Sequence, residues 1–385
     1  MFVARFILHK RFFVAIINSF FWERSVYMKK VLCIILSALI MLPLAVTSSA
    51  EGGSGTLKMI AYNVSGIPLV GNFQGSVYTS TNDRAAKIGA LLNGVDADFI
   101  GVEEDFNGHK YLAAQMENYP YRSANSGGLA QGQGLNAFSK HKLCNFERVN
   151  WNKEFGNLSG STDALSNKGF IYCLMELEPG VYINVITLHC DAGYEPLSVA
   201  CRRDNFKQLA EYINKNLNDG RALIVLGDFN FKFKRNLKDD IVTNLMEPTG
   251  LKDVWAEVYN NGITDFNDPD FDHEVEGDDL DRVLYRSGDY MTLEPVSKTV
   301  PPLTGENGEK YTDHNPMLTE FNYTVTGSEA VPENLTEPEK ENEFLLNLKE
   351  IGWTAVRFVQ LIFGLLELPY LIAQGIELLI NGKMP

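Results

Sequence analysis

Short apolar runs rich in β-branched residues recur along this chain, and most of them stop at a polar residue. The clearest run, Ile224-Val225-Leu226, indicates a buried strand, and Gly227-Asp228-Phe229-Asn230 follows it directly. Runs of this kind predict further strands at residues 57–64, 98–102, 142–150, 169–178, 182–188, 281–285, 291–295 and 316–322.

Two longer segments, residues 82–92 and 198–217, carry apolar residues at helical spacing. Thr81 or Asn82 is a plausible cap for the first of them. Strands that alternate with helices and hairpins predict an α/β fold. We expect two sheets packed face to face with helices on the outside.

The N-terminus resembles an export signal. Residues 28–50 combine a basic start, an apolar run and a small-residue end, as a secretory signal peptide does. A transmembrane anchor is the alternative, but the run is short for one. Residues 1–27 precede an internal Met28, and we interpret them as a mis-annotated upstream extension. The protein is therefore expected to be secreted, or to be membrane-associated on the extracellular side.

The C-terminus has two parts with different compositions. Residues 326–343 form an acidic linker rich in Pro and Glu, and residues 344–385 form a largely apolar helical tail. The polar residues of the tail fall close to helical spacing, at Glu350, Thr354, Arg357, Gln360, Glu367, Gln374 and Glu377. An interfacial helix or helical hairpin on a phospholipid membrane is the favoured interpretation. The alternatives are a self-associating helix and a true membrane anchor.

Composition narrows the class of protein. The chain has 385 residues, of which 45% are hydrophobic and 22% are charged, and this suits a folded soluble core. The formal net charge of -15 gives no basic footprint overall, so nucleic acid is the less favoured partner. Four cysteines follow the signal segment, and an exported protein permits disulfides. Cys144 and Cys173 are the first choice for a pair, and four buried free thiols are the alternative.

Polar residues gather where the predicted strands end. They are Asn63, Glu104, His189 with Asp191, Asp228 with Asn230, Asp281, and Asp313 with His314. Each of them alone is compatible with an ordinary turn. A recurring set restricted to Asn, Asp, Glu and His instead indicates one metal-dependent hydrolytic site.

The order of these motifs resembles that of the endonuclease/exonuclease/phosphatase superfamily. The motifs are Tyr62-Asn63-Val64, Val102-Glu103-Glu104, Thr187-Leu188-His189, Gly227-Asp228-Phe229-Asn230 and Thr312-Asp313-His314-Asn315-Pro316. The resemblance implies a DNase I-like fold, a four-layer α-β-β-α sandwich, with a catalytic domain over residues 56–325. The bacterial sphingomyelinase-like branch is similar still more closely, in the stretches Tyr62-Asn63-Val64-Ser65-Gly66-Ile67-Pro68, Glu103-Glu104-Asp105-Phe106 and His189-Cys190-Asp191-Ala192-Gly193.

The resemblance also implies roles for individual residues. Asn63 and Glu104 match positions that hold Mg²⁺, with Mn²⁺ and Ca²⁺ as alternatives. Asp228 and Asn230 match the pair that aligns the attacking water, and His189 matches a histidine that contacts the phosphate. His314 would be the general base or a phosphate contact, with Asp313 orienting it. Two departures stand out: Glu103 replaces a frequent Gln, and Arg282 follows Asp281 where Tyr is usual.

Three other segments bear on the substrate. The Gly-rich loop at residues 126–134 lacks the Lys-Ser/Thr of a phosphate-binding motif and is expected to be a flexible loop. For the basic stretch at residues 231–235 we expect either a binding site for a second phosphate or a solvated strand. The acidic stretch at residues 265–272 lacks the Gly of an EF-hand, so a solvated loop is favoured over a Ca²⁺ site.

The sequence thus predicts a Mg²⁺-dependent phosphodiesterase that acts on phospholipid head groups, as sphingomyelinases and phospholipases C do. A secreted nuclease or an inositol-phosphate phosphatase on the same fold is the first alternative. A catalytically inactive, membrane-associated binding protein is the second alternative.

Overall fold

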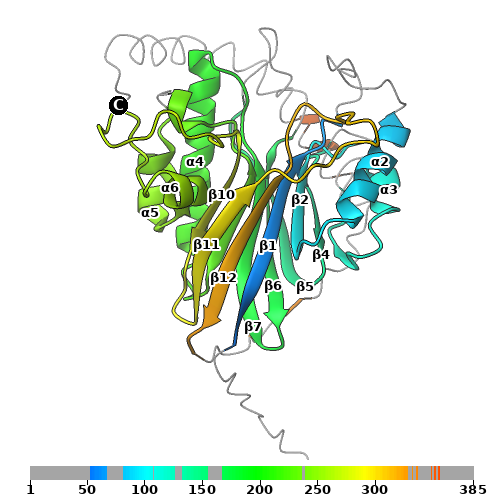
Figure 1. The fold of residues 1–385 in the computed structure, drawn as a ribbon, viewed down its shortest axis with the longest axis horizontal. Coiled ribbons are helices and arrows are strands. Elements are labelled where there is room, and N and C mark those ends of the chain that lie inside the picture. Colours follow the sequence, from blue (N-terminus) through cyan, green and yellow to red (C-terminus); the bar gives the residue numbers. More distant parts are fainter. Residues whose placement is uncertain are drawn as a thin grey trace, which may run out of the picture. The chain divides into compact units, whose positions relative to one another are not determined.

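Two six-stranded sheets pack face to face, and helices cover the outer face of each (Figure 1). This computed structural model describes residues 53–66, 81–106, 108–125, 132–154, 167–235 and 239–327, together with residues 332, 335, 336, 348, 351, 352, 354 and 355. The predicted signal peptide, the upstream extension and most of the linker and tail lie outside these residues, so the predicted domain boundaries stay predictions. Within the described part of the chain, no helix combines the length and apolar character needed to cross a bilayer.

The first sheet has the strand order β11-β12-β1-β2-β4-β3. Its strands are β1 (Ser54–Asn63), β2 (Phe99–Glu103), β3 (Tyr121–Arg122), β4 (Asn136–Ser139), β11 (Met291–Thr299) and β12 (Met317–Val325). The second sheet has the order β5-β6-β7-β8-β10-β9. Its strands are β5 (Lys142–Asn150), β6 (Gly169–Glu178), β7 (Val181–His189), β8 (Leu223–Asp228), β9 (Lys252–Asp253) and β10 (Asp281–Arg286).

Helices pack on the outer face of each sheet and complete the four predicted layers. Against the first sheet lie α2 (Thr81–Asn93) and α3 (His109–Ala113). Against the second lie α4 (Pro196–Asn216), α5 (Glu247–Thr249) and α6 (Val254–Tyr259), with short 3-10 and π turns at Phe233–Arg235 and Val242–Met246. Pro196 at the first turn suits the start of α4, because its fixed φ is already helical.

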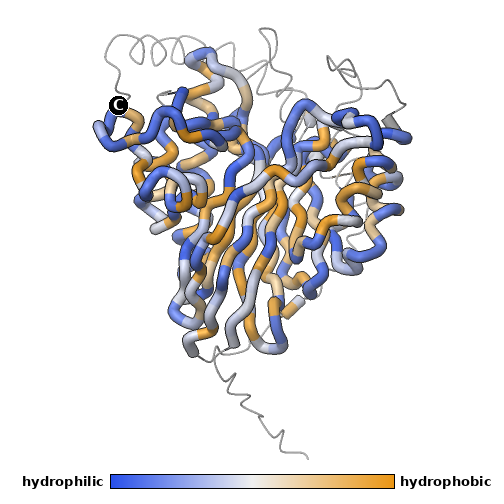
Figure 2. Tube along the Cα trace, in the orientation of Figure 1, coloured by the Kyte–Doolittle hydropathy of each residue, from blue (hydrophilic) through white to orange (hydrophobic). Residues whose placement is uncertain are grey.

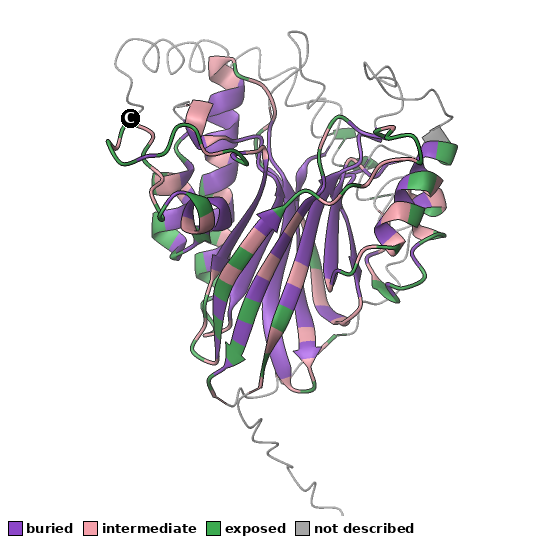
Figure 3. Ribbon diagram, in the orientation of Figure 1, coloured by how far each residue is buried: buried purple, intermediate pink, exposed green. Residues whose placement is uncertain are grey.

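Burial explains why the strands lie where they do. Every residue of β7 is buried, because β7 faces the other sheet on one side and α4 on the other. Strand β11 instead alternates buried and exposed residues over most of its length, and this is typical of a strand with one solvated face (Figure 3). Hydrophilic residues gather in the loops that connect the strands (Figure 2).

Most predicted elements are confirmed, and two strands, β5 and β6, have the predicted bounds. Strand β4 was missed because it follows the Gly-rich loop closely and has only four residues. Of the Gly-rich loop itself, residues 126–131 lie outside the described residues. The acidic stretch forms a loop in which Asp265, Asp268 and Asp272 accept hydrogen bonds from nearby backbone N–H groups, so their carboxylates already serve its turns.

The predicted pairing of Cys144 with Cys173 is wrong, because all four of these cysteines are buried free thiols. Cys144 pairs in register with Leu174, so Cys173 lies one residue away and points to the other face of the sheet. Cys173 packs between the two sheets, whereas Cys144 packs outside them against Leu174 and Tyr182. The alternative of four free thiols is confirmed.

A piece of the C-terminal segment contacts strand β5. Between Cys144 and Glu147 the register of β5 shifts, and Asn145 adopts a positive φ of 51° there. The backbone N–H of Asn145 donates to the Thr336 carbonyl at 2.9 Å, and the Asn145 side chain accepts from the Thr336 N–H and hydroxyl. Leu335 packs against the cluster of Cys144, Leu174 and Tyr182.

Candidate active site

The predicted site residues converge because of how the strands pair. Asn63 and Glu103 are partners at the ends of the parallel strands β1 and β2. His189 and Asp228 are partners at the ends of the parallel strands β7 and β8. Antiparallel pairing of β10 with β8 then places Asp281 beside Asp228. Residues far apart in the sequence therefore meet at one end of the two packed sheets.

Asp228 is the centre of this arrangement. Its Oδ2 atom lies 3.1 Å from Asn63 Nδ2, 3.3 Å from His189 Nε2 and 3.8 Å from His314 Nε2. Its Oδ1 atom accepts from the backbone N–H of Asn230 at 2.9 Å. Burial by itself raises the pKa of Asp228, but the two histidines and the other donors outweigh it and lower the pKa below its ordinary value. Asp228 is therefore a buried, ionised carboxylate.

His314 is paired with Asp281. Its Nδ1 atom lies 2.8 Å from Asp281 Oδ2. Burial lowers the pKa of His314, but Asp281 and Asp228 outweigh that effect and raise it to about 11. Burial likewise raises the pKa of Asp281, to about 6, although His314 opposes the rise. At neutral pH the pair is thus an imidazolium and a carboxylate, and this favours His314 as a phosphate contact over a general base.

Asp313 takes a different position from the predicted one. Its side chain is exposed, and its Oδ1 atom accepts a hydrogen bond from the Ser65 hydroxyl. Asp281 occupies the orienting position beside His314 that was predicted for Asp313. Asp281 reaches this position because it begins β10 and is the strand partner of Asp228.

The two neighbouring glutamates diverge. Glu104 adopts a positive φ of 57°, and its Oε1 accepts from Asn63 Nδ2 at 3.1 Å. Glu103 is fully buried and accepts from the Thr187 hydroxyl at 3.3 Å. Burial raises the pKa of both, and Asp281 and Asp228 raise that of Glu103 further. The amide oxygen of Asn63 accepts from the Ser65 N–H, so Asn63 turns its NH₂ group toward Glu104 and Asp228.

The residues at the site fit a divalent cation. Asp228 and Asp281 offer carboxylate oxygens, and these oxygens lie within 4.8 Å of each other and of a His314 ring nitrogen. Among the described residues, three buried polar atoms of the site have no hydrogen-bond partner: Glu103 Oε2, His189 Nδ1 and Asp281 Oδ1. Carboxylate oxygens are the ligands that Mg²⁺, Mn²⁺ and Ca²⁺ prefer. The metal-binding roles of Asn63 and Glu104 remain predictions, as do the catalytic roles of the other residues.

Two basic residues at the site were missed from the sequence. Lys168 is buried, and its Nζ donates to the Cys190 carbonyl, which also accepts from Asn230 Nδ2. Its charge lowers the pKa of His189, which burial has already lowered, so that histidine is neutral. Arg84 donates to the Ser65 carbonyl at 2.6 Å. Neither residue ends a predicted strand, so the signal that revealed the others was absent.

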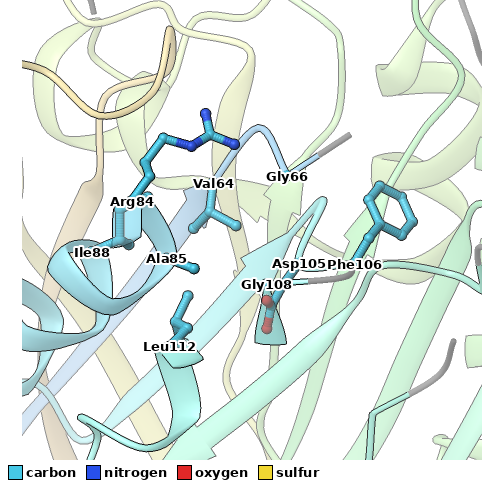
Figure 4. Close-up of a pocket in the computed structure, with 9 residues that line it drawn as sticks. All are labelled: Val64, Gly66, Arg84, Ala85, Ile88, Asp105, Phe106, Gly108 and Leu112. Atoms are coloured by element: carbon cyan, nitrogen blue, oxygen red, sulfur yellow. The ribbon is translucent and has the colours of Figure 1, made fainter. Parts of the chain in front are cut away.

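A small pocket borders the site on the side of α2 and α3 (Figure 4). Its lining consists of Val64, Gly66, Arg84, Ala85, Ile88, Asp105, Phe106, Gly108 and Leu112. Asp105 accepts from Asn136 Nδ2 at 3.0 Å and lies 2.6 Å from His109 Nδ1. This polar network fixes the backbone that follows Glu104.

The basic stretch at residues 231–235 is anchored by its aromatic residues. Phe231 and Phe233 are buried, whereas Lys232, Lys234 and Arg235 are partly exposed. The last three residues form a 3-10 turn rather than a strand, so the predicted solvated strand is wrong. Arg235 stacks over the exposed ring of Tyr194 at 4.3 Å.

Known proteins with similar sequences belong to the family that the motifs resemble. Residues 110–261 match the family described as Endonuclease/Exonuclease/phosphatase family 2. Sphingomyelinases of Mycobacterium bovis and Mycobacterium tuberculosis are each 30% identical over 281 residues, and the match covers 71% of this chain. The chain spans about half the length of these relatives, since the match covers 54% of them.

Solved structures of low sequence identity are also similar. A beta toxin of Staphylococcus aureus is 19% identical, with a TM-score of 0.48, and the match covers 68% of this chain and 99% of that one. Sphingomyelinase C of Streptomyces griseocarneus is 20% identical, with a TM-score of 0.46, and the match covers 71% and 100%. The family match and the sphingomyelinase relatives confirm the resemblance of this chain to the endonuclease/exonuclease/phosphatase superfamily that its motifs indicate.

Proposed function

We propose that the chain is a Mg²⁺-dependent phosphodiesterase that hydrolyses phospholipid head groups, as sphingomyelinases and phospholipases C do. The observation that carries the proposal is the convergence on Asp228, a buried carboxylate in contact with an amide and two histidines. The 30% identity to sphingomyelinases supports a phospholipid substrate.

The side chains suit attack by water on a phosphodiester. Asp228 is placed to orient the water and to accept its proton, and Asn230 lies beside it. The His314 imidazolium supplies positive charge for a phosphoryl oxygen, and Asp281 holds its ring in place. Attack forms one P–O bond and breaks the P–O bond to the lipid alcohol. The proton taken from water returns to the leaving oxygen, so the net change is the addition of water.

A divalent cation would add positive charge beside the phosphoryl group. When bound, Mg²⁺ neutralises negative charge on the phosphoryl group and the leaving oxygen. Glu104 is the carboxylate proposed to hold it, with Asn63 steadying Glu104 through the 3.1 Å hydrogen bond. The raised pKa values of Glu103, Glu104 and Asp281 support this proposal, because crowded, buried carboxylates favour a cation among them.

Export and membrane contact belong to the same proposal. The signal-like segment at residues 28–50 supports export, and the apolar tail supports contact with a phospholipid surface. Leu348 and Ile351 of the tail are exposed, and exposed apolar side chains of this kind support contact with a lipid surface. Self-association of the tail would use the same face.

The proposal is tested by a hydrolysis panel with and without Mg²⁺. The substrates are sphingomyelin, phosphatidylcholine, phosphoinositides, soluble inositol phosphates and DNA. We expect head-group release from the lipids, its loss in chelator, and its loss in Asp228→Ala and His314→Ala variants whose circular dichroism is unchanged. Exclusive cleavage of DNA would replace the proposal with a nuclease. Near wild-type turnover by either variant would contradict the site.

A further inference from the structure

Arg282 lies at the centre of a buried ionic network directly behind the site. It follows Asp281 in β10, and strand alternation sends its side chain to the opposite face of the sheet. Arg282 is fully buried. A buried guanidinium stays charged, so it needs partners that offset its loss of hydration, and its partners show which segments it joins.

The guanidinium of Arg282 contacts two loops as well as two carboxylates. Its Nε donates to Asp253 Oδ2 at 2.8 Å, and its Nη1 donates to Asp278 Oδ1 at 2.5 Å. Nη1 also donates to the carbonyls of Asp279 and Phe231, at 3.2 and 3.5 Å. The guanidinium carbon lies 4.4 Å from the centre of the Phe233 ring, within the range of a cation–π contact.

Asp278, which binds Arg282, also binds the loop that follows Asp228. Its carboxylate accepts from the backbone N–H groups of Phe233 and Lys234, at 3.2 and 2.7 Å. The Phe229 N–H donates to the Leu280 carbonyl at 3.0 Å. The loop that carries Asn230 is therefore tied to the loop that leads into Asp281, and Arg282 contacts both.

We propose that Arg282 is a positioning residue for the phosphodiesterase reaction, which holds Asp228, Asn230 and Asp281 in their relative places by tying residues 229–235 to residues 277–281. This inference rests on the proposed function. Reacting groups misplaced by about 1 Å can cost about 10²-fold in rate, so such a tie affects turnover. The planar fork of Arg makes several directed hydrogen bonds at once, which Lys cannot reproduce.

Arg286 offers a matched control on the same strand. It lies four residues after Arg282 on the same face of β10. Its guanidinium donates to the carbonyls of Thr249 and Leu217, at 2.7 and 2.9 Å, and neither residue belongs to a site loop. An Arg286→Met variant therefore removes an arginine from the same face of the same strand, and it leaves the contacts between residues 229–235 and residues 277–281 in place.

The test separates positioning from stability. Arg282→Met leaves Asp253 and Asp278 as buried, uncompensated charges, so it should lower the melting temperature. The triple variant Arg282→Met, Asp253→Asn, Asp278→Asn removes those charges and keeps acceptor oxygens for the backbone N–H groups. Arg282→Lys keeps the charge without the fork. Each variant is made in the full chain, and melting temperature, kcat and KM are measured with a soluble short-chain phosphodiester.

We expect the triple variant to recover the wild-type melting temperature while its kcat stays about 10²-fold low and its KM changes little. Arg282→Lys should stay folded with a kcat at least about tenfold low, and Arg286→Met should keep the wild-type kcat. Wild-type kcat in either the triple variant or Arg282→Lys would overturn the inference. Failure of the proposed function would show differently, as a wild-type chain that hydrolyses no phosphodiester.

Discussion

Asp281 Oδ2 lies 2.8 Å from His314 Nδ1, and this contact joins the first strand residue of β10 to the loop before β12 in the other sheet. It links the two halves of the sandwich at the site itself. The carboxylate holds the ring in one orientation and keeps the imidazole charged at neutral pH. The pair therefore controls both where the histidine points and when it titrates.

Asp281→Asn should move the alkaline limb of the pH–rate profile to lower pH by more than one unit. Asp281 is the main partner that raises the pKa of His314 to about 11, so its loss lets the pKa fall toward an ordinary value of about 6.5. In the wild type, the charged His314 side chain stabilises the folded state. This stabilisation is fully present below about pH 6.5 and is lost as pH rises through about 11. The measurement is kcat/KM from pH 6 to 11 on a soluble substrate.

Asp313→Asn is the control for that experiment. Asp313 binds the Ser65 hydroxyl and contributes least of the three carboxylates that raise the pKa of His314, so the alkaline limb should move much less in this variant than in Asp281→Asn. A limb that moves with Asp313→Asn but not with Asp281→Asn would restore the orienting role first predicted for Asp313.

Glu104→Gln should weaken activation by Mg²⁺ about tenfold or more, and Glu103→Gln should weaken it much less. Glu104 faces Asn63, whereas Glu103 is engaged with the Thr187 hydroxyl between the sheets. A Mg²⁺ titration of activity, paired with calorimetric titration of Mg²⁺ binding, measures both constants. The reverse order would show that the wrong carboxylate has been assigned to the metal.

Glu103→Gln should stabilise the metal-free protein at pH 8 and leave its stability unchanged at pH 4. Burial, Asp281 and Asp228 raise the pKa of Glu103 in the folded state. The protonated Glu103 side chain stabilises the folded state relative to the ionised one. This stabilisation is fully present below about pH 4.3 and is lost as pH rises through the raised pKa. Glutamine cannot ionise and avoids that loss. Urea unfolding in EDTA at both pH values checks the sign, and Glu294→Gln on exposed β11 is the control.

Truncation before Phe344 should leave hydrolysis of a soluble short-chain substrate nearly unchanged and sharply reduce vesicle binding and vesicle hydrolysis. Burial of apolar side chains in a lipid surface contributes roughly 25 cal/mol of binding free energy per Å². The tail is largely apolar, so its removal should remove much of this binding free energy. Vesicle co-sedimentation and paired activity assays measure the effect. If the truncated protein still binds and cleaves vesicles, the tail has another role, with self-association the first to test.

The sequence was most informative where a local pattern decides the structure. Strand β6 is an apolar run bounded by turn residues, and its bounds follow from that pattern. His189 and Asp228 were found because each ends such a run. The contact of Asp281 with His314 could not be found in this way, because it joins residues of different sheets and depends on how the two sheets pack.

Burial of charge was also hard to foresee. Arg282 looked like a departure that weakened the match, yet it is a fully buried residue with two carboxylate partners. One of those partners, Asp253, is 29 residues away in sequence. Local periodicity holds no information on such a network, and only the tertiary structure shows that the charges compensate one another.

The contact between Asn145 and Thr336 has a consequence for solubility. Strand β5 is the outermost strand of its sheet, and an edge strand is a template on which another chain can pair. The register shift at Asn145 interrupts the regular pairing of β5, and the Asn145 backbone N–H already donates to the Thr336 carbonyl. We therefore expect the segment around Thr336 to hinder edge-to-edge pairing at this point of the sandwich. A chain shortened before Leu335 would lose that protection, whereas one shortened before Phe344 would keep it.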